Sequence, residues 1–125
     1  MLATLLAVCA AACAGTLLRW GIALWLNPGG LLPWGTLAVN LVGGYLIGLA
    51  LGVLDGLPQA DPAWRAMVVT GFLGSFTTFS SFSAETVGML SAGRTGLALA
   101  TIALHVAGSL GLTWLGFETV RWLAR

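Results

Sequence analysis

Hydroxyl, amide and imidazole side chains recur inside stretches of this chain that are otherwise apolar. The densest group lies in residues 71–82, where two threonines and three serines alternate with four phenylalanines and no charged residue is present. A run this rich in hydroxyls can release backbone groups from helical hydrogen bonding and satisfy them locally. Inside a membrane, irregular backbone is tolerated only where protein or a water-filled cavity covers it. The run therefore predicts a broken helix at membrane depth that lines a cavity.

The backbone carbonyls released at such a break are potential cation ligands. Where Gly74 to Thr77 leaves helical geometry, its C=O groups become available to a hard cation such as Na⁺. If an inverted second copy supplied the same carbonyls, one cation on the twofold axis would hold the two chains together.

The phenylalanines of this run favour a path for a small anion. Phe79 and Phe82 are three residues apart, with Ser80 and Ser81 between them. Phenylalanine in a membrane ordinarily packs, but an aromatic ring has a positive edge that can face an anion. Neighbouring hydroxyl and amide donors can replace part of the hydration shell of that anion. Because no Lys or Arg lies at midspan, the ion would not be trapped.

Two further sets of polar side chains lie in other apolar segments. Asn40 carries two donors and an acceptor, which either bind neighbouring helices together or face a pore. Thr101, His105, Ser109 and Thr113 recur every four residues and form a polar stripe on one side of a helix. Single hydroxyls usually bond to their own helix, whereas a row of four is less easily explained in this way. With no paired carboxylate nearby in sequence, His105 is interpreted as a neutral pore-side or packing residue rather than a proton relay.

Composition indicates that a membrane surrounds these residues. The chain has 125 residues, of which 58% are hydrophobic and 7% charged, whereas soluble domains carry about a quarter charged residues. A net charge of +1 offers no basic patch for nucleic acid. A membrane helix needs about 20 apolar residues. We expect one all-α integral membrane domain over residues 1–125 with four spans, namely 2–26, 32–54, 63–92 with a break near 74–78, and 97–123.

The arginines do not select an orientation in the membrane. Three of them, Arg65, Arg121 and Arg125, fall on one side of a four-span chain, and Arg19 and Arg94 fall on the other. A chain that inserts both ways could pair with an inverted copy of itself. Arg19 lies near a span end, so we expect its side chain to extend to the membrane interface.

Small residues at four-residue spacing predict close helix packing. Gly44, Gly48 and Gly52 form such a row in the second span, and Ala103, Ala107 and Gly111 form one in the fourth. Rows of small residues allow helices to approach closely in lipid.

The run at residues 71–82 resembles the signature of a known family, the Fluc or CrcB fluoride channels. That signature is close to GFLGGFTTFSTF, and the chain departs from it only at Ser75 and Ser81. Residues 15–20 and 35–43 resemble the family's first-span and second-span patterns, so the similarity covers nearly the whole chain.

The resemblance implies an antiparallel dual-topology homodimer with two fluoride pores and a central structural Na⁺. It implies that Na⁺ is bound by the main-chain carbonyls of Gly74 and Thr77. It also implies a polar track in the last span, where histidine stands in place of the expected tyrosine. The residues expected in the fluoride pore are Asn40, Phe79, Phe82, Ser80, Ser81, His105, Ser109 and Thr113.

The expected function is a passive fluoride channel in the bacterial inner membrane, with fluoride, the bilayer and a second copy as partners. The alternative is a small dual-topology proton-coupled multidrug exporter, which needs a titratable carboxylate at membrane depth. The first span has no Asp or Glu, and Glu85 and Glu118 lie toward span ends. A purely structural subunit would leave the polar residues unexplained. No nucleophile, base and acid occur at a spacing that suggests an enzyme.

Overall fold

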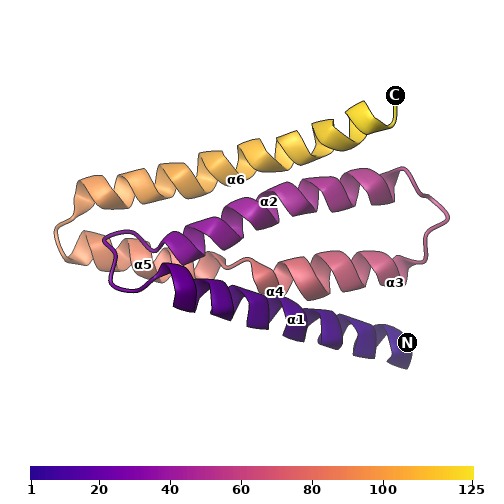
Figure 1. Ribbon diagram of the computed structural model, residues 1–125, viewed down its shortest axis with the longest axis horizontal. Helices are drawn as coiled ribbons and strands as arrows, with labels where there is room; N and C mark the ends of the chain where they lie inside the picture. Colours follow the sequence, from indigo (N-terminus) through magenta and orange to yellow (C-terminus); the bar gives the residue numbers. More distant parts are fainter.

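The computed structural model describes all residues, 1–125, and is entirely helical (Figure 1). Three of the helices are long, and the third of the four passes along the chain is made of shorter helices. The helices are α1 (Leu2–Leu26), α2 (Trp34–Asp55), α3 (Pro62–Arg65), the π-helix η1 (Ala66–Leu73), α4 (Gly74–Phe76), α5 (Phe79–Ser91) and α6 (Thr95–Leu123).

The chain runs along the long axis of the molecule four times. Figure 1 shows both termini at the same end, together with the loop between α2 and α3, and the other two connections at the opposite end. Three helices, α1, α2 and α6, are long and apolar enough to cross a membrane. Their bounds lie within two residues of the expected segments. Gly29 lies in the turn between α1 and α2, and Gly93 lies in the turn between α5 and α6. Their φ values are 76° and 72°, which glycine adopts without strain.

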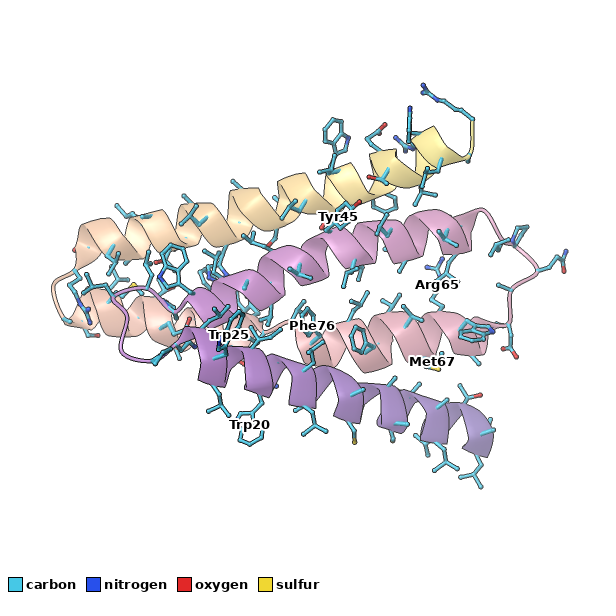
Figure 2. All side chains as sticks on the ribbon, in the orientation of Figure 1. Trp20, Trp25, Tyr45, Arg65, Met67 and Phe76 are labelled. Atoms are coloured by element: carbon cyan, nitrogen blue, oxygen red, sulfur yellow. The ribbon has the colours of Figure 1, made fainter.

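Much of the apolar surface has no protein contact within the chain. Only 18 of 125 residues are buried, and the accessible surface is 7715 Å². A compact water-soluble monomer of 12.9 kDa would expose about 6,300 Å². On α1, Trp20 points away from the bundle and is 62% exposed, whereas Phe76 of α4 is enclosed between the helices (Figure 2). A surface of this kind requires lipid or another protein chain around it.

Glycines bring α2 and α6 into backbone contact. A Cβ added to Gly48 would overlap the carbonyl oxygen of Thr113, and one added to Gly116 would overlap that of Tyr45. A Cβ on Gly44 would lie 3.0 Å from the carbonyl oxygen of Ser109. The glycine row predicted in the second span therefore packs closely as expected.

The row of small residues predicted in the last span does not contact α2. Ala103, Ala107 and Gly111 are exposed, and nothing lies within 4 Å of a Cβ added to Gly111. The α6 face that meets α2 instead carries three members of the polar stripe, His105, Ser109 and Thr113, and continues to Gly116. Within one chain this row therefore meets no helix, and close packing of this face stays a prediction. Both rows have the same four-residue spacing, and spacing alone does not say which of them faces a neighbour.

The third pass begins at Pro62, one residue before the expected segment. The Asp61 carboxylate accepts a hydrogen bond from the Ala63 N–H at 2.8 Å, and Pro62 occupies the first helical position. The π-helical stretch that follows was not predicted. It packs against α1, where a Cβ on Gly71 would lie 2.8 Å from the Val8 carbonyl oxygen. Apolar composition does not distinguish π-helical from α-helical hydrogen bonding, so the sequence carries no signal for it.

Two extended residues, Thr77 and Thr78, separate α4 from α5. Their φ and ψ angles are −84° and 161°, and −150° and 110°. The Thr78 hydroxyl accepts a hydrogen bond from the Ser81 N–H at 3.2 Å and so caps the start of α5. This extended pair lies within the run that the sequence singled out.

Candidate ion-binding site

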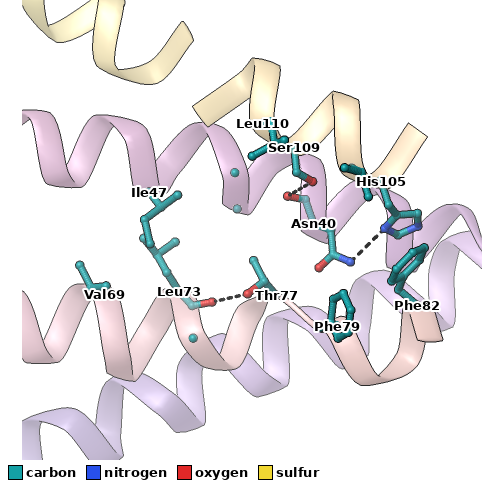
Figure 3. Close-up of a pocket in the computed structure, with 14 residues that line it drawn as sticks. Asn40, Ile47, Val69, Leu73, Thr77, Phe79, Phe82, His105, Ser109 and Leu110 are labelled. Carbon is teal, nitrogen blue, oxygen red and sulfur yellow. Dashed lines mark hydrogen bonds between the residues drawn. The ribbon is translucent and has the colours of Figure 1, made fainter. Parts of the chain in front are cut away.

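Asn40 joins the extended pair to α2 and α6. Its Oδ1 accepts a hydrogen bond from the Thr78 N–H at 2.7 Å, and its Nδ2 donates to the Thr78 carbonyl at 2.9 Å. The Nδ2 also lies 3.1 Å from Nδ1 of His105 (Figure 3). The Asn40 amide thus bonds both the N–H and the carbonyl of Thr78, as the backbone of a neighbouring strand would. Its two N–H donors are used by the Thr78 carbonyl and by His105.

These contacts release two carbonyls from the helical ladder. In a continuous α-helix the Thr78 N–H would donate to the Gly74 carbonyl, and the Ser81 N–H to the Thr77 carbonyl. Here Asn40 Oδ1 accepts from Thr78 and the Thr78 hydroxyl accepts from Ser81. The two freed carbonyls are those that the sequence assigned to a cation, and carbonyl oxygens are suitable ligands for a hard cation.

The hydroxyls of Thr77 and Ser75 bond back to the helical turn before them. Thr77 donates its N–H and its hydroxyl to the Leu73 carbonyl, both at 3.0 Å. The Ser75 hydroxyl donates to the Gly71 carbonyl at 2.7 Å. Ser75 therefore fits a helical turn here, although glycine is usual in the signature.

Arg19 reaches the end of α4. Its Nε donates to the Ser75 carbonyl at 2.9 Å, from a position seven residues before the end of α1, or about 10 Å along the helix. The sequence did not predict this partner, which lies 56 residues away. A cation next to carbonyls at a helix C-terminus is favourable because these carry partial negative charge.

Replacing Arg19 by Met is expected to lower the free energy of unfolding by about 2 kcal/mol, because the Ser75 carbonyl loses a charged donor. The matched control is Arg121→Met. Arg121 forms an exposed ion pair with Glu118 at 2.6 Å, so its loss should cost about 0.5 kcal/mol or less. Chemical unfolding in detergent micelles measures both changes, and equal effects would contradict the role given to Arg19.

A cavity of about 400 Å³ brings together most of the predicted site residues (Figure 3). Its wall contains no Asp, Glu, Lys or Arg. Phe79 is 78% exposed, whereas Phe82 is 8% exposed. The Phe82 ring centre lies 5.5 Å from that of Phe79 and 4.5 Å from that of His105. The predicted residues that line this cavity are Asn40, Gly74, Thr77, Phe79, Phe82, His105 and Ser109.

Three predicted pore residues lie outside this cavity. Ser80 and Ser81 place their hydroxyls 3.3 and 3.0 Å from that of Thr78. Ser81 faces a separate space of about 40 Å³ that Arg19 also lines. Thr113 donates to the Gly44 carbonyl at 2.9 Å, so its hydroxyl takes part in helix packing.

Sequence reasoning missed two features of the site. Thr78 was noticed only as one hydroxyl of the run, yet its peptide and its hydroxyl organise the interruption. Glu85 was placed toward a span end, but its Oε1 accepts a hydrogen bond from Thr36 at 2.6 Å and its Oε2 is buried without a protein partner. The Asn40 partner of the Thr78 peptide and the Thr36 partner of Glu85 are 38 and 49 residues away, so no local pattern could have identified them. The contact between the Thr78 hydroxyl and Ser81 is local, and a threonine at the start of a helix is a signal that could have identified it.

Comparison with known proteins establishes the family. The family model described as CrcB-like protein, Camphor Resistance (CrcB), matches residues 6–117. The chain belongs to the CrcB family. It is 64% identical to a protein of Paracidovorax citrulli (strain AAC00-1) named "Fluoride-specific ion channel FluC", over the full length of both chains.

Two other relatives carry the same name. A protein of Variovorax paradoxus (strain S110) is 60% identical over 99% of each chain. A protein of Albidiferax ferrireducens (strain ATCC BAA-621 / DSM 15236 / T118) is 54% identical over 98% of this chain and 95% of its own. Membership of the CrcB family, together with the long apolar helices, makes this a multi-pass membrane protein.

Proposed function

We propose that this protein is a fluoride-selective channel of the bacterial inner membrane through which cytoplasmic fluoride leaves passively, down its electrochemical gradient. The proposal is carried by the cavity beside the extended pair, whose wall contains Phe79, Phe82 and uncharged polar side chains but no charged residue. Full-length identity to relatives named fluoride-specific ion channels supports it.

Such a wall suits conduction of a small anion. The positive edges of Phe79 and Phe82 and the polar groups of Asn40, His105 and Ser109 would replace part of the hydration shell. Because no cationic side chain lines the cavity, the ion would be bound weakly enough to leave. A proton-coupled exporter would need a carboxylate in this wall, and Glu85 is not among the lining residues.

Residues 62–91 would form a fourth, interrupted membrane crossing. The extended pair lies beside the protein cavity, where irregular backbone is covered. The exposed Phe79 at this cavity and the large apolar surface support assembly with a second, inverted copy. The channel would then be an antiparallel dual-topology homodimer.

Dual topology predicts that reporters fused to the C-terminus are found on both sides of the membrane. The arginines give only a weak bias, so neither orientation should dominate. Paired reporters, one active only in the cytoplasm and one only outside it, measure the two populations. A single location would contradict the proposal.

Two backbone carbonyls would hold a structural Na⁺ at the dimer interface. The carbonyls of Gly74 and Thr77 fit this role because the N–H groups that would bond to them in a helix bond elsewhere. One donates to Asn40 and the other to the Thr78 hydroxyl. The side chain of Thr77 bonds to Leu73, so it is not needed as a ligand. The ion would link the two copies through main-chain oxygens alone.

The melting temperature of Thr77→Ala is therefore expected to depend on Na⁺. It should drop when Na⁺ is replaced by a large organic cation. The parent protein should show a drop of similar size. Loss of the Na⁺ response in a variant that remains folded would assign the ligand role to the side chain.

Fluoride efflux from liposomes containing the purified protein tests the proposed function, with chloride efflux measured in parallel. Rapid fluoride release with little chloride release is expected. Folded protein that releases neither ion would overturn the proposal.

A further inference from the structure

An apolar groove runs between α2 and the first part of the third pass, toward the end of the molecule that holds both termini (Figure 1). It encloses about 600 Å³, and eleven of its twelve lining residues are hydrophobic. Its α2 wall extends from Leu46 to Leu54, which is about 12 Å along the helix. Val53 and Trp64 in its walls are 48% and 57% exposed, so the chain itself does not cover the groove.

The groove lies on a different side of α2 from the cavity at the candidate ion-binding site. The cavity takes Asn40, Gly43, Gly44 and Ile47 from α2, and the groove takes Leu46, Leu49, Ala50, Val53 and Leu54. At 3.6 residues per turn, the centres of these two sets are about 100° apart around the helix. A second copy seated over the cavity would therefore cover another side of α2 than the one that forms the groove.

At one end the groove opens into a polar pocket of about 320 Å³ that carries two carboxylates and one guanidinium. Arg65, the last residue of α3, donates from Nη2 to Asp55 Oδ1 at 2.6 Å and so joins α3 to α2 (Figure 2). The third charge is Asp61, whose Oδ1 caps α3 and whose Oδ2 is left available. The residues that line both the groove and the polar pocket are Leu54, Leu57, Ala60 and Asp61.

The polar pocket lies where the helices leave the membrane. Asp55 is the last residue of α2, and Trp64 lies at the start of the third pass. Tryptophan prefers the level of the lipid headgroups, so the groove extends from this level into the hydrocarbon. A ligand with a charged head at the boundary and an apolar tail below it is a phospholipid.

We propose that the groove binds one acyl chain of a phospholipid with a primary ammonium headgroup, whose ammonium bonds to Asp55 and Asp61 and whose phosphate bonds to Arg65. Two carboxylates and one guanidinium leave one negative charge in excess, which favours a headgroup that carries a cation. The guanidinium has five N–H donors, so the bond to Asp55 leaves others for the phosphate. A trimethylammonium headgroup has no N–H to donate, and an anionic headgroup has no cation. This inference does not depend on the proposed function.

Native mass spectrometry of the full-length protein tests the inference by counting bound lipids. The protein is titrated in detergent with phosphatidylethanolamine, phosphatidylcholine or phosphatidylglycerol that all carry the same acyl chains. We expect phosphatidylethanolamine to bind about fivefold more tightly than either of the others, which is the upper range for one exposed charge pair. Equal binding of the three lipids would overturn the assignment of the headgroup.

Asp61→Asn separates the charge of this residue from its role in folding. Asparagine caps a helix as well as aspartate does, so α3 should still form. The preference for phosphatidylethanolamine should fall to about the level of phosphatidylcholine. The matched control is Glu118→Gln on α6, which removes another exposed carboxylate that pairs with an arginine at 2.6 Å and lies outside the polar pocket. This control should keep the preference of the parent, and equal losses in the two variants would contradict the proposed site.

Ala50→Phe tests the position of the acyl chain, because it places a large side chain in the wall of the groove. Binding of all three lipids should fall together, while size-exclusion chromatography should show the oligomeric state of the parent. Parent-like lipid binding by the folded variant would exclude the groove as the site. A variant that changes oligomeric state would show that a second copy of the chain occupies the groove, which would also overturn the proposal. If Ala50→Phe does not fold, the comparison of Asp61→Asn with Glu118→Gln still decides it.

Discussion

Fluoride efflux is expected to fall by about 100-fold when Asn40 is replaced by Asp. The aspartate can still accept from the Thr78 N–H, but it cannot donate to the Thr78 carbonyl or to His105. Each lost bond at a buried group costs about 1–3 kcal/mol, and every 1.4 kcal/mol is a factor of ten. The substitution also places a negative charge in the wall of a cavity proposed to carry an anion.

Liposome efflux with a fluoride electrode measures this change. Size-exclusion chromatography and circular dichroism establish that the variant is folded and retains the oligomeric state of the parent. Tyr45→Phe, on the same helix pair but not in the cavity wall, should conduct at the parent rate. Efflux from folded Asn40→Asp within about twofold of the parent would show that the amide is not needed at this site.

The second large effect is expected on folding. Gly48→Ala should prevent α2 and α6 from packing, because the added methyl group would overlap the Thr113 carbonyl oxygen and lie 3.1 Å from the Gly116 Cα. These are backbone atoms, so no side-chain rotation relieves the overlap. Overpacking of this kind costs about 1–3 kcal/mol or more, a large part of the stability of a small protein.

Thermal unfolding followed by fluorescence-detected size exclusion measures the loss. Gly111→Ala, on the other side of α6, adds the same methyl group where nothing lies within 4 Å, so it should unfold at or slightly above the parent temperature. Equal melting temperatures for the two variants would mean that α2 and α6 are not in close contact in the membrane.

Local composition was sufficient to predict the helical passes. Apolar runs of about 20 residues separated by Gly, Pro and Asn predict a helical membrane protein, because backbone groups in lipid must bond within their own segment. The hydroxyl-rich run likewise indicated where the third pass leaves helical geometry, and the extended residues Thr77 and Thr78 lie inside it. These features depend on residues close together in the chain.

The partners of the polar groups required the tertiary structure. Asn40 meets a peptide 38 residues away, and Arg19 meets a carbonyl 56 residues away. Helical periodicity places a side chain on a face but does not say which neighbour that face meets. The glycine row of α2 packs against α6, whereas the row of small residues on α6 faces away from α2.

The sequence by itself thus determined that this is a helical membrane protein with uncharged polar groups inside its apolar segments, since solvation and backbone bonding depend on local composition. Only the tertiary structure decided which carbonyls are released, that Arg19 bonds to Ser75, and that Asn40 bonds to His105. Hydrogen bonds between helices depend on rotation and register, and these are set by packing of the whole chain.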